Sequence, residues 1–117
     1  MIRESIGPWT AYRERFGLSP DDEIDLHFGS RDPHKRYREV MQEVEELVRD
    51  SLHKAQANDR RYIMYIHGRS TSRRGAMTAR SVVRGFMRSK EATPFIERSK
   101  CVQHETVFVA KIKPLAT

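Results

Sequence analysis

The chain has 117 residues, of which 38% are hydrophobic and 32% charged, and its formal net charge is +6. This length predicts one domain with a modest core, and the apolar runs are too short to cross a bilayer. A positive excess favours polyanions, nucleic acid before an anionic membrane surface, so we expect a nucleic-acid partner and no membrane association. The single cysteine excludes an internal disulfide, and with the lack of an apolar leader it predicts a cytoplasmic protein.

The first 21 residues predict a short helical extension ahead of the main domain. Pro8 is a typical opener of a helix, and Trp9, Tyr12 and Phe16 follow it at helical spacing. We expect this helix to dock on the core through its aromatic side chains. The remaining residues, 22–117, form the predicted domain.

A strand and a long helix open this domain. The stretch Glu23–Phe28 alternates apolar and polar residues, which predicts a strand with Asp25 and His27 on one face. Asp32, followed by a proline, is a typical N-cap. An apolar stripe at helical spacing then runs to about Gln56, with acidic residues on the opposite side.

A second strand and a second helix follow. The apolar run Tyr62–Ile66 predicts a buried strand. Thr71 or Ser72 is the predicted cap of the next helix, which extends to about Ser89. This helix has one apolar side and one basic side.

Two further strands, 100–103 and 106–113, are predicted to close the chain as a hairpin. The resulting order is β-α-β-α-β-β. Strand–helix–strand units predict parallel pairing with a right-handed crossover, and the hairpin adds an antiparallel edge. We therefore predict an α/β fold, a two-layer sandwich with a mixed four-stranded sheet.

The positive charge is concentrated in residues 60–90, which contain nine Lys or Arg and no Asp or Glu. On the second helix, four arginines fall within about 80° of one another on a helical wheel: Arg73, Arg80, Arg84 and Arg88. One interpretation is a solvated basic face that pairs with the acidic side of the first long helix. The preferred interpretation is a surface that binds phosphates, because arginine offers them bidentate hydrogen bonds.

The loop between the second strand and the second helix extends this basic surface. Loops that precede a helix favour anions, because free backbone N–H groups and the helix dipole point toward them. The spacing of a Walker A loop is absent, so nucleotide hydrolysis is not expected. The predicted phosphate-binding residues of the loop are Gly68, Arg69, Ser70, Thr71, Arg73 and Arg74.

Asp25, His27 and His67 are the candidate catalytic residues. If the two strands are parallel neighbours, all three lie at carboxyl ends, where open α/β sheets bind ligands. A histidine can act as general acid or base near neutral pH, and Asp25 could orient one of the imidazoles. The alternative is that each histidine only caps its strand through hydrogen bonds. No spacing here is diagnostic of a metal, so we predict no metal site and leave a divalent cofactor open.

Four other residues receive structural interpretations. We expect His34 and His53 to face solvent on the first long helix, and His104 to lie in a turn. Cys101 has no neighbour in sequence that marks it as a nucleophile, so we expect a partly buried strand residue.

The order of these features resembles the small MutS-related (Smr) domain. The stretch "IDLH", Ile24–His27, resembles the family's Leu-Asp-Leu-His-Gly motif, and "HGRS", His67–Ser70, resembles its glycine-containing loop. The similarity covers residues 22–113. The chain departs from the family pattern at Phe28 and at Ser70, where the family has glycine.

The resemblance implies a nucleic-acid-binding domain, often an endonuclease that nicks DNA or cleaves RNA. It implies that Asp25 and His27 belong to the catalytic strand end and that His67 and Gly68 line the substrate loop. We therefore predict phosphodiester hydrolysis, with phosphate charge stabilised by nearby arginines: Arg69, Arg73 and Arg74. The alternatives are a non-catalytic nucleic-acid-binding module and a protein-interaction or assembly domain that uses its N-terminal aromatic helix.

Overall fold

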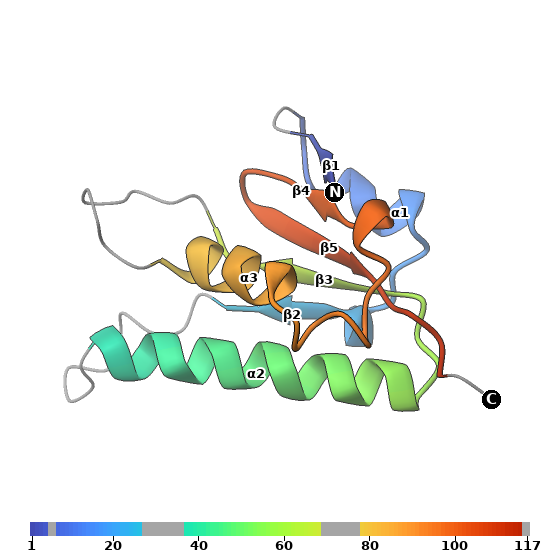
Figure 1. Cartoon of the computed structure of the whole chain (residues 1–117). Helices are drawn as coiled ribbons and strands as arrows, with labels where there is room; N and C mark the ends of the chain where they lie inside the picture. The colour runs from blue at the N-terminus through green and yellow to red at the C-terminus, as the bar shows by residue number, and fades with distance from the viewer. Residues whose placement is uncertain (5–6, 27–36, 69–77, 116–117) are drawn as a thin grey trace.

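The computed structural model describes residues 1–4, 7–26, 37–68 and 78–115 of the chain (Figure 1). Its helices and strands are β1 (Ile2–Arg3), α1 (Ala11–Arg15), β2 (Glu23–Asp25), α2 (Tyr37–Ala57), β3 (Tyr62–Ile66), α3 (Ala79–Arg88), β4 (Val102–Gln103) and β5 (Val107–Lys111). Short 3-10 turns lie at Pro20–Asp22 and Arg98–Lys100. The mixed α/β content agrees with the predicted fold class.

The strands form one mixed sheet in the order β1-β4-β5-β3-β2. β2 and β3 are parallel neighbours, and β5 runs antiparallel to both β3 and β4. The predicted parallel pair and C-terminal hairpin are therefore confirmed. The predicted number of strands, four, is wrong, because the described residues form a five-stranded sheet.

The fifth strand comes from the N-terminal segment, which we expected to contribute only a helix. β1 pairs parallel with β4, with Ile2 opposite Val102. Main-chain bonds hold it there: Ile2 N donates to Cys101 O at 2.8 Å, and Glu4 N donates to Gln103 O at 2.9 Å. A strand of two residues has no alternation pattern, so only long-range hydrogen bonding defines it.

Helices α2 and α3 cover one face of the sheet (Figure 1). Val44, Val48 and Leu52 of α2 are fully buried there, together with Tyr65 of β3 and Phe108 of β5. The predicted apolar stripe of the first long helix therefore forms the main core. The two helices lie on one face of the sheet as predicted, but the predicted element order β-α-β-α-β-β is wrong, because the strand β1 precedes α1 at the start of the chain.

The opposite face is also covered, which the two-layer prediction did not include. Tyr12 of α1 packs against a second cluster on that side, and its neighbours there are Met64, Val102, Val107 and Val109. Trp9 and Phe16 are partly buried beside it. Because both faces of the sheet are covered, the sequences of β3 and β5 are almost continuously apolar and do not alternate between apolar and polar residues.

Helix α3 begins later than predicted. Its N-cap is Thr78, whose Oγ accepts a 3.1 Å hydrogen bond from Ser81 N. The Ser81 hydroxyl in return accepts a 2.8 Å bond from Thr78 N, which completes a capping box. The predicted cap at Thr71 or Ser72 is therefore wrong for this helix, and those two residues, like Asp32, lie outside the described ranges.

Candidate nucleic-acid interface

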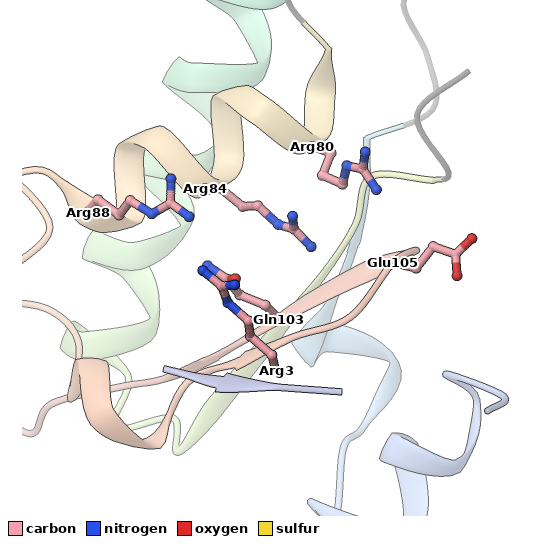
Figure 2. A pocket seen from close by; sticks show the side chains of 6 residues that line it. All are labelled: Arg3, Arg80, Arg84, Arg88, Gln103 and Glu105. Atoms are coloured by element: carbon pink, nitrogen blue, oxygen red, sulfur yellow. The ribbon is translucent and has the colours of Figure 1, made fainter. Parts of the chain in front are cut away.

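The described part of the chain contains a pocket of about 410 Å³ in which four arginines gather. Figure 2 shows Arg3 and Gln103 projecting from β1 and β4 toward Arg84, with Arg88 and Arg80 on either side of it. Three of the arginines belong to the predicted basic side of α3. Arg3 and Gln103 were missed, because only the pairing of β1 with β4 brings them to this place.

Like charges crowd each other in this arginine pocket. Burial lowers the pKa of the Arg84 guanidinium, and the charges of Arg80, Arg88 and Arg3 lower it further. Arg84 remains cationic, because a guanidinium is not deprotonated in proteins. The repulsion is a cost that a bound anion would remove.

Arg84 is only partly satisfied by protein groups. Its Nη2 donates a 3.2 Å hydrogen bond to the main-chain oxygen of His104. Its Nε is buried and has no hydrogen-bond partner among the described residues. A buried donor without an acceptor is costly, so this Nε is a polar group that the described part of the fold does not satisfy.

The basic row is held in place by the packing of α3. Val83, Phe86 and Met87 on its other side are buried in the main core. Arg98 closes the C-terminal end of the helix, since its Nε donates to Met87 O at 2.9 Å and its Nη2 donates to Ser89 O at 3.0 Å. A cation there also suits the negative end of the helix dipole.

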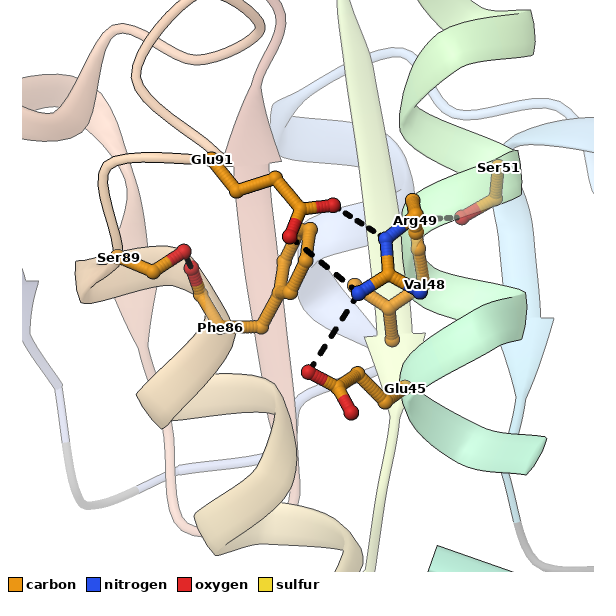
Figure 3. A network of polar contacts seen from close by, with 7 residues as sticks. All are labelled: Glu45, Val48, Arg49, Ser51, Phe86, Ser89 and Glu91. Carbon is orange, nitrogen blue, oxygen red and sulfur yellow. Dashed lines mark hydrogen bonds and ion pairs between the residues drawn. The ribbon is translucent and has the colours of Figure 1, made fainter. Parts of the chain in front are cut away.

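A polar network links α3 to α2 (Figure 3). Arg49 of α2 donates hydrogen bonds to Glu91, which follows α3, and makes an ion pair of 3.6 Å with Glu45. Its guanidinium carbon also lies 5.5 Å from the ring centre of Phe86. The bridge between the two helices is thus built from Arg49, while the arginines of the pocket face β1 and β4 (Figure 2).

Asp25 and His67 lie at the same end of the sheet but belong to different faces. Asp25 is in register with Ile66, which packs on the α1 side, so strand alternation places Asp25 on that side. His67 lies on the α3 side, near enough to Arg84 for its charge to act on the imidazole. The carboxyl ends meet as predicted, whereas the two side chains do not share one face.

His67 is a buried, neutral histidine. It is 5% exposed, and its Nδ1 donates a 2.8 Å hydrogen bond to Gly68 O, which leaves Nε2 unprotonated. That Nε2 has no partner among the described residues. Burial, the largest cause, and the charges of Arg84 and Arg80 together lower the pKa of His67 to about 4, against the hydrogen bond to Gly68.

Gly68 lies at the start of the predicted phosphate loop in a backbone conformation that suits glycine. Its φ is 78°, in the left-handed region. The amides of His67 and Gly68 both donate to Thr106 O, at 3.1 and 2.9 Å. The other predicted loop residues and His27 lie outside the described ranges: Arg69, Ser70, Thr71, Arg73 and Arg74.

The remaining histidines and the cysteine have structural surroundings. His53 is exposed, as expected, and its ring centre lies 4.2 Å from that of Phe95. His104 lies in the turn between β4 and β5, as predicted, but is buried there. Cys101 lies just before β4 rather than in a strand, and it is fully buried rather than partly buried. Burial raises the pKa of its thiol. His34 lies outside the described ranges.

The described ranges contain neither a cluster of metal-ligating side chains nor a helix that could span a membrane. No group of three or more His, Cys, Asp or Glu side chains in these ranges is placed to hold a metal ion. None of the helices in the same ranges combines the length and the hydropathy needed to cross a membrane. The candidate site is built on the arginine pocket, where four guanidinium groups gather.

A scan against protein-family models, a search of curated proteins and a search of solved structures each return no match for this chain. The resemblance to the Smr domain therefore stays a prediction. The function has to be inferred from the pocket itself.

Proposed function

We propose that this chain is a nucleic-acid-binding domain that holds phosphates of a DNA or RNA strand in the arginine pocket. The observation that carries the proposal is the convergence of Arg3 with Arg80, Arg84 and Arg88 around one pocket. These side chains come from β1 and from α3, so the fold gathers positive charge from distant segments. Phosphate oxygens are the natural acceptors for grouped guanidinium donors.

Binding of this kind depends strongly on salt. Each neutralised phosphate releases counterions, so the logarithm of affinity falls with the logarithm of salt concentration by roughly 0.7 to 0.9 per contact. A net charge of +6 adds long-range attraction that is equally screened by salt. The proposal therefore predicts tight binding at low salt with little dependence on sequence.

Phosphodiester hydrolysis by an Smr-like domain is the finer part of the proposal. It assigns acid–base roles to His27 and His67 and an orienting role to Asp25. The described geometry supports binding more directly than hydrolysis, because the Nε2 of His67 is buried and Asp25 lies on the other face of the sheet. Hydrolysis is tested by incubating plasmid and RNA with wild type, His27→Ala and His67→Ala, with and without divalent metal. If the wild-type protein cuts neither substrate, the hydrolysis part of the proposal is wrong, whereas the binding part stands.

The binding test compares two double variants that lose the same charge. Arg80→Gln with Arg88→Gln removes two guanidinium groups from the pocket. Arg38→Gln with Arg61→Gln removes two exposed arginines that do not line it. We expect the first pair to weaken binding of a labelled oligonucleotide by at least tenfold in fluorescence anisotropy at moderate salt, and the second pair to change it only slightly. Equal losses in the two pairs would mean that net charge, and not this pocket, attracts the polymer.

The interaction-domain alternative receives less support from the structure. Tyr12 is 5% exposed and packs on the sheet, and Trp9 and Phe16 are partly buried with it. The aromatic residues of the N-terminal helix therefore pack against the chain's own sheet and leave little aromatic surface for a partner. We therefore place binding of nucleic acid ahead of assembly through this helix.

A further inference from the structure

The arginine pocket has a second wall opposite α3. A surface that only follows the backbone of a nucleic-acid strand would not need this wall. Arg80, Arg84 and Arg88 alone would form a row along α3, with about 6 Å of helix rise between successive members. Arg3 and Gln103 form the opposite wall, as Figure 2 shows. The result is a concave, half-open pocket of about 410 Å³, with room for a nucleotide-sized group between its two walls.

The charge of the pocket also exceeds what one internal phosphate supplies. Four guanidinium groups line it, and one carboxylate, Glu105, stands at its end, away from Arg84 and Arg88 (Figure 2). An internal phosphodiester carries one negative charge and two free oxygens. A terminal phosphomonoester is close to a dianion above its second pKa of about 6 and presents three free oxygens. Bidentate arginine contacts use such oxygens in pairs.

We propose that the arginine pocket takes the terminal phosphomonoester of a nucleic-acid strand, with the end nucleotide inside the pocket. This inference rests on the proposed function and names the part of the polymer that the same site recognises. The guanidinium groups of Arg80, Arg84 and Arg88 line the pocket and offer N–H donors suited to the three phosphate oxygens. The side-chain carbonyl of Gln103, on the opposite wall, is an acceptor suited to a hydroxyl or amino group of the terminal nucleotide.

The test uses the full chain and one oligonucleotide sequence in four forms. These carry a 5′-phosphate, a 3′-phosphate, hydroxyl groups at both ends, or a closed circle without ends. We expect one phosphorylated form to bind at least about tenfold more tightly than the hydroxyl form and the circle in fluorescence anisotropy. The two phosphorylated forms tell which end is recognised. The preference should shrink when the pH falls from 8 to below about 6, because the monoester loses a charge.

The outcomes separate this inference from the proposed function. If all four forms bind with equal affinity, the terminal-phosphate inference is wrong and the proposed function stands. If none binds at low salt, the proposed function fails and the inference fails with it. Arg88→Gln, at an exposed position of the pocket, should remove most of the end preference, and Arg61→Gln should retain it. Arg3→Gln provides a second variant on the opposite wall, and an unchanged preference in both pocket variants would also overturn the inference.

Discussion

Arg84 of α3 donates a 3.2 Å hydrogen bond to the main-chain oxygen of His104, so the central arginine of the pocket is tied to the turn between β4 and β5. The imidazole of His104 in turn donates from Nε2 to Gly7 O at 2.9 Å and accepts at Nδ1 from Thr106 N at 3.0 Å. Its ring also meets that of Tyr12 edge-on. One buried histidine thus connects the N-terminal segment, the turn and the arginine pocket.

His104→Leu should therefore weaken binding although His104 does not line the pocket. The change removes both hydrogen bonds of the imidazole and loosens the segment that carries Arg3. We expect a several-fold loss of oligonucleotide affinity, measured by anisotropy. If the loss acts through Arg3, the double variant with Arg3→Gln should bind no more weakly than Arg3→Gln alone. Additive losses would show that His104 acts by another route.

Arg3→Gln tests whether the N-terminal strand belongs to the binding surface. Arg3 lies far in sequence from the basic segment, and it reaches the pocket because β1 pairs with β4. We expect weaker binding and a plot of log affinity against log salt that is shallower by roughly 0.7 to 0.9, the share of one phosphate contact. The exposed Arg61→Gln is the control. A slope that Arg3→Gln leaves unchanged would place the ligand outside this pocket.

The buried His67 should make the fold sensitive to acid. Its pKa is about 4 in the folded chain and near 6.5 when unfolded, so the unfolded chain holds more protons between these values. The contribution of His67 to the free energy of unfolding is therefore fully present above pH 6.5. It falls by about 3 kcal/mol as the pH drops to about 4. Urea denaturation of wild type and His67→Gln at pH 7.5, 5.5 and 4.5 measures this contribution. Parallel pH profiles for the two proteins would contradict the assignment.

Tyr65 and Ser51 form a buried hydroxyl pair in the main core. Their oxygens lie 2.6 Å apart, and Ser51 Oγ also donates to Val48 O at 2.8 Å. Burial raises the pKa of Tyr65, so its hydroxyl stays protonated. Tyr65→Phe removes the bond to Ser51 and a long 3.5 Å bond from the Tyr65 hydroxyl to Val48 O, and it leaves Ser51 satisfied by Val48. We therefore expect a loss of about 1 kcal/mol in urea denaturation. A loss above roughly 3 kcal/mol would indicate that the ring packing had changed as well.

Local patterns in the sequence are sufficient to predict which of the main segments are helices and which are strands. The stripe of α2 and the apolar run of β3 predicted both elements, and the hairpin of β4 and β5 was recognised from its two apolar segments. The row of arginines on α3 was also visible, because helical spacing places residues four apart on one side. The predicted start of α3 is too early, because the capping box of this helix forms at Thr78.

What the sequence alone determined is the class of fold, the concentration of positive charge and the row of Arg80, Arg84 and Arg88. The tertiary structure decided that Arg3 joins this row, that Asp25 and His67 lie on different faces, and that His104 and His67 are buried. The physical reason is the distance in sequence between the residues that interact. Helix spacing and strand alternation are set by neighbours along the chain, whereas the pairing of β1 with β4 depends on hydrogen bonds between segments about 100 residues apart. Such contacts leave no periodic trace in a two-residue strand.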